Sequence, residues 1–306
     1  MAGMKPALVA LIAALGTLVF ILIPLRAPGA PQIFNLVAAQ STVTLSGTID
    51  VYGASASLQP QDTGSLATSY SGTINADFGN SQIQFTGGSS IAALNDGSWQ
   101  PAPGGSDGEG PADYGGTAQF QISIFTDTAY AAMRNVVLDV NSASLSISNG
   151  VFDTTNLLFS FSTNIVGAID YLDDFGDSGS DPLSGSLTDN GGANAYVTMT
   201  NGLLELIIPV SATYVVGNSL ALDGTVLYLD GQFVAVQAPP PWITSAVISQ
   251  HVATVTATNT TSLSHLQSSL DLATWQATDA TATYISGTTI FVLPATNLVT
   301  FYRVER

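Results

Sequence analysis

The reactive side chains of this chain are almost all carboxylates. Its 306 residues include 22 aspartates and glutamates, two histidines and no cysteine. Cysteine nucleophiles, thiolate metal sites and disulfides are therefore excluded. The one catalytic arrangement that this composition supports is a pair of carboxylates, one a general acid and the other a base or nucleophile. Such a pair is typical of glycoside hydrolases and lyases.

Glu205 is the carboxylate with the most apolar sequence surroundings. In a strand, its neighbours on the same face are Leu203 and Ile207, and burial among them would raise its pKa as a general acid requires. The alternative is a solvent-facing position on an edge strand that ends at Pro209. No spacing pairs Glu205 with a second carboxylate. The others in or near predicted strands are Asp50, Asp139, Asp170 and Asp230.

The densest group of acidic residues lies in a segment rich in glycine and serine. Asp173, Asp174, Asp177 and Asp181 offer hard oxygen ligands without a compensating positive charge. Calcium is their natural counter-ion, and these four residues are the predicted metal ligands. Their spacing follows neither the EF-hand loop nor the glycine-rich calcium-binding repeat, so a solvated acidic loop is the alternative. The sequence predicts no other cofactor.

The histidines and tryptophans allow few other kinds of site. His251 and His265 both lie in the C-terminal part of the chain, so the larger N-terminal part can hold neither a serine–histidine triad nor a histidine-rich metal site. Trp99 and Trp242 flank predicted turns or the linker. An exposed indole ring there could stack on a sugar, and a core position is the alternative.

The charge of the chain excludes polyanionic partners. The formal net charge is −17, and the only basic residues are Lys5, Arg26, Arg134, Arg303 and Arg306. Neutralising the phosphates of a nucleic acid needs clustered lysine and arginine, so nucleic-acid binding is not expected. Charged residues make up only 9% of the chain, and serine, threonine, asparagine and glycine take their place. This composition is typical of a β-rich extracellular protein.

The N-terminal residues 1–39 predict export. Lys5 precedes a nearly unbroken apolar run from Ala7 to Leu25, which indicates a hydrophobic signal helix. The small residues before Gln40 suit signal peptidase, so cleavage after Ala39 is predicted. The alternative is an uncleaved signal anchor, because the run is nearly long enough to cross a bilayer. A membrane association is expected only in that case.

The rest of the chain predicts an all-β fold with two domains. Apolar residues alternate from Thr42 onward, and asparagine–glycine or aspartate–glycine pairs separate the alternating runs. Residues 40–237 are expected to form a large antiparallel β-sandwich or β-barrel body, since periodicity alone does not decide between them. The prolines of the segment 238–241 form a stiff linker. Residues 242–306 suit a small immunoglobulin- or fibronectin-like sandwich, with Trp275 as its core anchor.

Within the body, two expectations depend on turn residues and composition. Asn149-Gly150, Asn201-Gly202, Asp223-Gly224 and Asp230-Gly231 are the pairs expected to form tight hairpin turns. The segments Pro101 to Gly116 and Asp173 to Gly192 are expected to be loops.

Two stretches resemble parts of exported bacterial proteins. Gln267 to Trp275 and Phe301 to Val304 are similar to a C-terminal module of many secreted proteins from environmental bacteria. That resemblance implies a fibronectin-like accessory domain without catalysis. Gly64 to Ile74 and Ile83 to Ile91 resemble uncharacterised exported proteins of the PEP-CTERM-associated kind. The sorting tail of those proteins is missing here, and the resemblance assigns no functional residue.

These observations favour a non-catalytic exported protein of the cell envelope, extracellular matrix or adhesion type. The first alternative is a calcium-assisted protein that binds extracellular polysaccharide. The second is a carboxylate-based glycoside hydrolase or lyase. An enzyme is thus the less favoured class, and envelope components or extracellular polysaccharide are the expected partners.

Overall fold

The computed structural model confirms that the chain is all-β. It describes residues 18–21, 32–51, 53–79, 81–94, 97–122, 125–189, 191, 193–217, 222–295 and 299–305. Across these ranges the elements are strands and one short 3₁₀ turn, η1 (Ala38–Gln40). No helix in the described part of the chain is long and apolar enough to span a membrane.

The chain divides into two compact units. One unit comprises Pro28–Ala238 and is called the body. The other comprises Met1–Ala27 and Pro239–Arg306, and its C-terminal segment is called the module. The division falls beside the proline run, whose residues cannot donate the main-chain hydrogen bonds of a continuous strand.

The larger sheet of the body joins fourteen of the described strands. Its longest hairpin, β21–β22, pairs Glu205 through Val215 with Val236 through Val226. Its strands are β2 (Gln32–Leu36), β3 (Thr42–Val51), β4 (Ala54–Ser57), β6 (Ala67–Gly79), β7 (Gln82–Phe85), β8 (Ser90–Ala93), β13 (Val137–Ser142), β14 (Leu145–Ser146), β15 (Val151–Asp153), β16 (Leu157–Phe161), β19 (Thr188–Asp189), β20 (Asn194–Thr200), β21 (Leu203–Val215) and β22 (Val226–Gln237).

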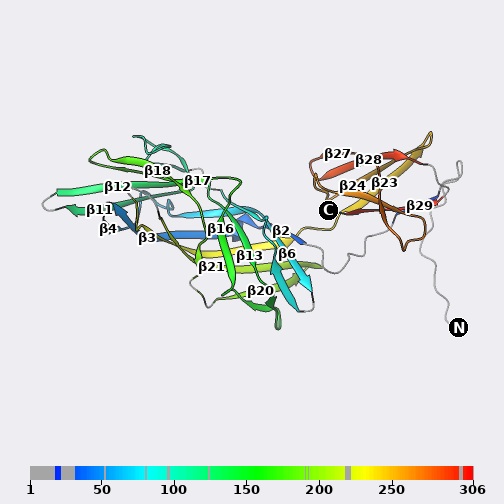
Figure 1. Cartoon of the computed structure of the whole chain (residues 1–306), viewed down its shortest axis with the longest axis horizontal. Helices are drawn as coiled ribbons and strands as arrows, with labels where there is room; N and C mark the ends of the chain where they lie inside the picture. Colours follow the sequence, from blue (N-terminus) through cyan, green and yellow to red (C-terminus); the bar gives the residue numbers. More distant parts are fainter. Residues whose placement is uncertain are drawn as a thin grey trace. The chain divides into compact units, whose positions relative to one another are not determined.

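A smaller antiparallel sheet lies against one end of the larger sheet (Figure 1). Its strands are β5 (Gln59–Pro60), β11 (Tyr114–Ile122), β12 (Phe125–Arg134), β17 (Gly167–Asp173) and β18 (Ser178–Leu183). Leu45 and Leu227 of the larger sheet line one narrow cavity together with Tyr114 and Met133 of the smaller sheet. The two sheets therefore share a core, and the body is sandwich-like. A separate pair, β9 (Gly97–Trp99) and β10 (Gly110–Ala112), packs beside β11.

The body begins earlier than the sequence pattern predicted. Strand β2 pairs with both β22 and β6, and its Phe34 is fully buried in the core. The body boundary predicted at Gln40 is therefore wrong, and cleavage after Ala39 would remove a strand from the interior of the sheet. The apolar side chain of Phe34 is the physical reason why this strand belongs to the body.

Most of the predicted signal segment lies outside the described residues. Of residues 1–31, only β1 (Leu18–Ile21) is described, and it pairs in parallel with β29 (Val299–Glu305). The predicted signal helix falls mainly on undescribed residues. Residues 38–40, at the predicted cleavage site, form η1, which interrupts the sheet between β2 and β3.

Turn residues explain several of the hairpins. Asn149-Gly150 and Asn201-Gly202 adopt positive φ at both positions, as tight hairpin turns require, which confirms those predictions. Asp223-Gly224 lies in the longer connection between β21 and β22, and only its glycine has positive φ.

Asp230-Gly231 does not turn, and both residues lie inside β22. Gly231 is needed there because a Cβ atom would lie 2.1 Å from the carbonyl oxygen of Thr42. The predicted hairpin at that pair is therefore wrong. The predicted loop from Pro101 to Gly116 is also partly strand, since it contains β10 and the first residues of β11.

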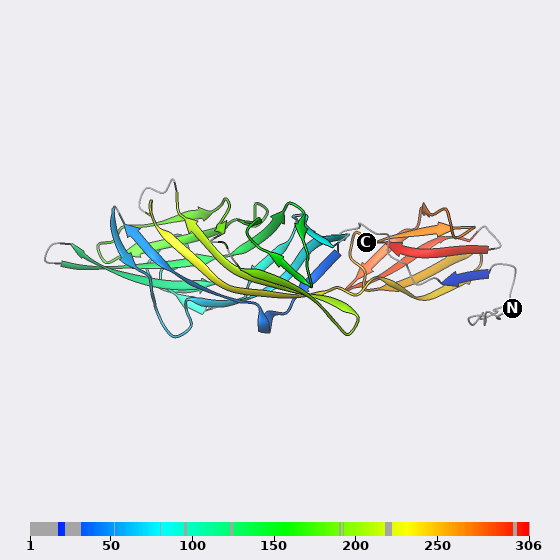
Figure 2. The ribbon, with the colours of Figure 1, turned by 90° about the horizontal axis from the view of Figure 1, so that it is seen from below.

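The module is a two-layered β structure. One layer contains β23 (Trp242–Ser249), β24 (Val252–Thr258), β28 (Thr288–Pro294) and β27 (Thr281–Ile285) in that order. The other contains β29, β25 (His265–Ser269) and β26 (Gln276–Ala277), with β1 beside β29. The module's strands, coloured yellow to red, form these two layers in Figure 2.

The core of the module lies between its two layers. Phe291, Val255, Tyr302 and Val304 are among its buried residues. Trp275 is not one of them. It is half-buried, and the guanidinium of Arg303 lies 4.6 Å from its ring centroid. The prediction that Trp275 anchors the core is therefore wrong, because Phe291 and Tyr302 are the large aromatic side chains of that core.

Candidate functional site

The predicted calcium ligands lie along the β17–β18 hairpin. Asp173 ends β17, Asp174 and Asp177 belong to the turn, and Asp181 lies within β18 opposite Ile169. The hairpin also shows that part of the predicted loop from Asp173 to Gly192 is strand, since β18 continues the smaller sheet.

The carboxylate of Asp173 stabilises the turn. Its Oδ1 accepts hydrogen bonds from the backbone N–H groups of Phe175 at 3.0 Å and Asp177 at 2.8 Å. Among the described residues, no three acidic or histidine side chains lie close enough to hold a metal ion together. The structure therefore brings Asp173 to turn amides and does not gather the four predicted ligands into one cluster.

The other strand carboxylates also have local partners. Asp50, Asp139, Asp170 and Asp230 lie in different parts of the body, and none pairs with another. Asp50 accepts from the Gly53 amide and the Ser55 hydroxyl, Asp139 accepts from the amides of Gly88, Ser89 and Val140, and Asp230 accepts from the Ser211 hydroxyl. Each of these three carboxylates thus closes a turn or links neighbouring strands.

Glu205 does not occupy an apolar cavity. It lies in β21 between β20 and β22, where Leu206 and Ile208 are the buried residues and Glu205 belongs to the alternate, partly exposed face. The proposed general-acid environment is therefore not formed. The solvent-facing alternative is correct, although β21 is an interior strand and not an edge strand.

A buried ion pair was not predicted from the sequence. Arg134 in β12 donates to the carboxylate of Asp170 in β17 and to the carbonyl of Pro101. Both side chains of the pair are almost fully buried. Arg134 is the sole basic residue between Pro28 and Ala238. That isolation is the one sequence feature that could have indicated a structural role for it. Through the Pro101 carbonyl, Arg134 fastens the beginning of the 101–113 segment to the smaller sheet.

Asp113 lies beside this pair. Its carboxylate accepts a hydrogen bond from the Val136 amide at 2.8 Å. Burial raises the pKa of Asp113, while the Val136 amide and the charge of Arg134 oppose that rise. Nearby, the hydroxyls of Tyr70 and Tyr114 lie 2.9 Å apart in the core, and burial raises the pKa of both. These groups are buried in the body, so they are not accessible to a substrate.

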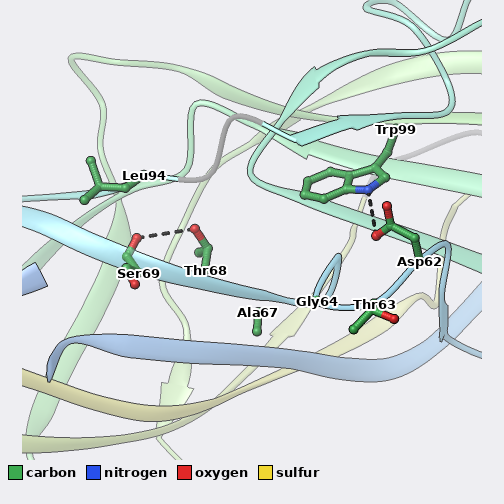
Figure 3. Close-up of a pocket in the computed structure, with 8 residues that line it drawn as sticks. All are labelled: Asp62, Thr63, Gly64, Ala67, Thr68, Ser69, Leu94 and Trp99. Atoms are coloured by element: carbon green, nitrogen blue, oxygen red, sulfur yellow. Dashed lines mark hydrogen bonds between the residues drawn. The ribbon is translucent and has the colours of Figure 1, made fainter. Parts of the chain in front are cut away.

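A hollow of about 400 Å³ opens on the body next to Trp99 (Figure 3). Its wall includes Thr63, Thr68 and Ser69, which bring hydroxyl groups to it. The indole Nε1 of Trp99 donates to Asp62 Oδ1 at 3.1 Å. Trp99 is only 6% exposed, so it is an anchor of the wall. The sugar platform considered for Trp99 is not formed, because its ring is covered.

Trp242 is the opposite case. It is 56% exposed and begins β23 at one corner of the layer formed by β23, β24, β28 and β27. The strand registers align Trp242 with Thr258, Thr288 and Ile285 across the four strands. Because paired residues point to the same side of a sheet, these side chains share one face.

This outward face, called the neutral face, carries no ionisable side chain in its four strands. Hydroxyl and β-branched residues dominate it, and neighbouring strands place them about 4.8 Å apart while alternate residues along a strand lie about 6.8 Å apart. Its positions are Trp242, Ser245, Val247, Ser249, Val252, Thr254, Thr256, Thr258, Thr281, Thr283, Ile285, Thr288, Ile290, Val292 and Pro294.

The other layer of the module carries an arginine–glutamate ion pair. Arg303 in β29 lies 2.7 Å from Glu305, and His265 in β25 lies 3.4 Å from the same carboxylate. Gln267 accepts from Arg303 Nε at 2.7 Å. These contacts and the Arg303–Trp275 stack form a second, charged face. The module therefore presents two chemically distinct surfaces on its two layers.

No protein-family model matches the chain, and neither a curated protein nor a solved structure matches it. The chemistry of the site therefore has to come from the chain's own geometry. Of the surfaces described above, only the neutral face combines regular spacing, exposed aliphatic and hydroxyl groups and an exposed indole ring. It is the candidate binding site.

Proposed function

We propose that this chain is a non-catalytic, exported adhesion protein whose module attaches to an uncharged polysaccharide surface through the neutral face. The single observation that carries the proposal is that none of the outward positions of that face holds an ionisable side chain, in a protein of net charge −17. A binding partner without charge is the one that this surface can meet without leaving an ion desolvated.

The chemistry of the face matches that of packed sugar chains. Sugar rings present C–H groups on their faces and hydroxyls at their edges. Threonine side chains provide both a methyl group and a hydroxyl, and the indole of Trp242 offers an apolar face with a polar N–H. Val247 and Ile285, exposed by 58% and 64%, add aliphatic contacts. Such exposed apolar groups on the surface of the module favour a binding role.

The rest of the proposal extends the sequence-based predictions. Export, an envelope or matrix location and a fibronectin-like class for the module are supported by composition, the N-terminal apolar run and the two-layered architecture. The body, in which Asp50, Asp139 and Asp230 close turns or link strands, then acts as a spacer or scaffold. The polysaccharide-binding alternative is preferred over catalysis because Glu205 has no apolar site and no carboxylate partner.

Binding to insoluble, uncharged polysaccharides tests the proposal. The full chain is mixed with cellulose, chitin or an unsubstituted glucan, and the bound fraction is measured after sedimentation. Replacing Trp242 by Ala, or Thr254 by Lys at the centre of the face, should weaken binding at least tenfold. Trp275→Ala is the matched control, because it removes an indole from the opposite, charged layer and should leave binding unchanged.

Three results would contradict the proposal. Binding that survives both changes on the neutral face would place the contact elsewhere. Tighter binding to anionic than to uncharged polysaccharides would mean that the protein selects its partner by the partner's charge. Self-association of the free chain that Thr254→Lys abolishes, without any polysaccharide binding, would show that the face joins two copies of this protein.

A further inference from the structure

Asp127 and Asp173 lie on the same face of the smaller sheet. The register pairs Ala129 of β12 with Asp173 of β17, and Asp127 precedes Ala129 by two residues. Residues two apart in a strand point to the same side, and Ala129 belongs to the core. Both aspartates therefore lie on the inner side of this sheet, where β12 and β17 meet the turn of the β17–β18 hairpin.

Both carboxylates are enclosed. Asp127 is 2% exposed and Asp173 is 7% exposed. Oδ1 of Asp127 is buried and has no hydrogen-bond partner. Protonation does not satisfy this atom. When Oδ1 is ionised, no hydrogen-bond donor lies beside it, and when it is protonated, its hydroxyl has no acceptor. A buried polar atom without a partner is costly, so it calls for a ligand.

The charges around Asp127 are negative. Burial first, and then the charges of Asp173 and Asp174, raise the pKa of Asp127, while backbone amides of Asp174 and Thr128 oppose that rise. The sole cationic side chain of the body, Arg134, is engaged with Asp170 and Pro101, and it lies on the other face of β12. No protein cation therefore compensates the pair.

We propose that Asp127 and Asp173 bind a calcium ion at the tip of the β17–β18 hairpin. Asp127 Oδ1 and the carboxylate of Asp173 are the protein ligands. Since no third acidic or histidine side chain joins them in the described part of the chain, backbone carbonyls and water complete the coordination. Two carboxylates give weak affinity, with a dissociation constant of about 10⁻⁴–10⁻³ M, as in extracellular calcium modules.

This site differs from the acidic loop predicted from the sequence. That prediction grouped Asp173 with Asp174, Asp177 and Asp181 along one hairpin. The structure instead sets Asp173 beside Asp127, which lies on a different strand and far earlier in the sequence. Asp177 contributes its backbone amide to Asp173 and keeps its own side chain exposed. The inference is independent of the proposed polysaccharide binding, which concerns the module.

The test is calorimetric unfolding of the full chain with and without calcium chloride, at ionic strength matched with sodium chloride. With calcium alone as the probe, ~10 mM should raise the unfolding temperature of the body by about 2–6 °C. Asp127→Asn should abolish that shift. Asp173→Asn should weaken calcium binding at least tenfold while keeping the turn, because the asparagine oxygen still accepts from the turn amides. Asp177→Asn changes the same charge at an exposed position and should keep the full shift.

Each outcome supports or overturns the site. A shift that Asp127→Asn and Asp173→Asn remove and Asp177→Asn keeps supports it. If magnesium or sodium raises the unfolding temperature of the body as much as calcium does, the site is overturned, because the effect is then general screening of an acidic protein. The site is also overturned if Asp127→Asn stabilises the body while the wild-type chain shows no response to calcium, because Asp127 and Asp173 then share a proton and not a calcium ion. Titration calorimetry of folded Asp173→Asn decides the case if Asp127→Asn does not fold.

Discussion

The body and the module use charge in opposite ways. The body contains all but three of the chain's acidic residues and a single cation, which it buries against Asp170. The module has a surface ion pair, Arg303–Glu305, on one layer, and the strands of its other layer carry no charged side chain. A surface of one sign keeps a protein soluble and repels polyanions, whereas a neutral, regular surface can dock. Under the proposed function, this difference assigns the scaffold role to the body and the binding role to the module.

The largest expected effect concerns the N-terminal strand of the body. A chain that begins at Gln40 lacks β2 and the buried Phe34, so its body should not fold, while the module should keep its own unfolding transition. A chain that begins at Gln32 is the matched control, because it also lacks β1 but retains β2. Calorimetry of the two chains measures this. Equal body transitions in both would show that β2 is dispensable.

If the protein is exported and cleaved, the same strand limits where the mature chain can start. Cleavage should occur upstream of Gln32, and N-terminal sequencing of the exported form checks this. A mature chain that begins at Gln40 and still unfolds cooperatively would contradict the role of β2.

The next effect separates the buried cation from the surface cation. Arg134→Met leaves the Asp170 carboxylate buried without its partner, which should cost the body about 3–5 kcal/mol. Arg303→Met removes a surface pair of the module and should cost less than about 1 kcal/mol. Denaturant unfolding of each variant gives both values. The double variant Arg134→Met, Asp170→Leu should recover most of the loss, and failure to recover would mean that Arg134 acts mainly through Pro101.

Two aromatic truncations sharpen the account of the module. Phe291→Ala removes a fully buried ring and should destabilise the module by about 3–5 kcal/mol. Trp275→Ala removes only a half-buried ring stacked with Arg303, a contact worth about 0.5–1 kcal/mol. The module's transition in calorimetry measures both, and the body's transition should not move. A larger loss from Trp275→Ala than from Phe291→Ala would restore Trp275 as the anchor.

The smallest expected effects are opposite responses to acid. In the body, the pKa of Asp127 is raised in the folded state, so its ionisation opposes folding at neutral pH. That penalty disappears as pH falls through the folded pKa toward the unfolded value of about 4. The body's unfolding temperature should therefore rise slightly between about pH 7 and pH 4 in calcium-free buffer. Asp127→Asn should remove the part of this rise that comes from that group.

In the module, amides of Thr274 and Ala273 lower the pKa of Asp271 to about 2. The stabilisation from this turn is present above the unfolded pKa of about 4 and is lost as pH falls through about 2. The module's unfolding temperature should therefore decline over that window, and Asp271→Ala should flatten the decline. A parallel response of the two transitions to acid would contradict the assignment of these groups.

Local sequence patterns are enough to predict the fold class. The positions where the prediction fails are those whose structure depends on contacts with residues distant in the sequence. Alternation and the asparagine–glycine pairs predicted the strands and two hairpin turns. Asp230-Gly231 has the same local signature, yet Gly231 serves the close approach of Thr42, which is distant in sequence. Likewise β2 lies in what resembles a leader, and only its pairing with β22 and β6 identifies it as part of the body.

The candidate sites were less predictable for the same reason. Asp173 was singled out by composition, but its partner in the proposed calcium site, Asp127, comes from another strand and had no marking in the sequence. The sequence offers Trp99 and Trp242 alike for sugar contact, and only their exposure separates them. The neutral face depends on which residues of four strands align, and only the strand register shows this.

The burial of Arg134 also determines how proteases meet this protein. Trypsin-like enzymes cut after lysine or arginine, and a chain of ordinary composition offers such bonds along its whole length. Here the stretch from Ala27 to Tyr302 offers a single one, after Arg134, and folding buries that side chain. The folded body should thus resist such proteases without any special rigidity. Even the unfolded chain would give only two long fragments from that stretch, so resistance to this class of protease is built into its composition.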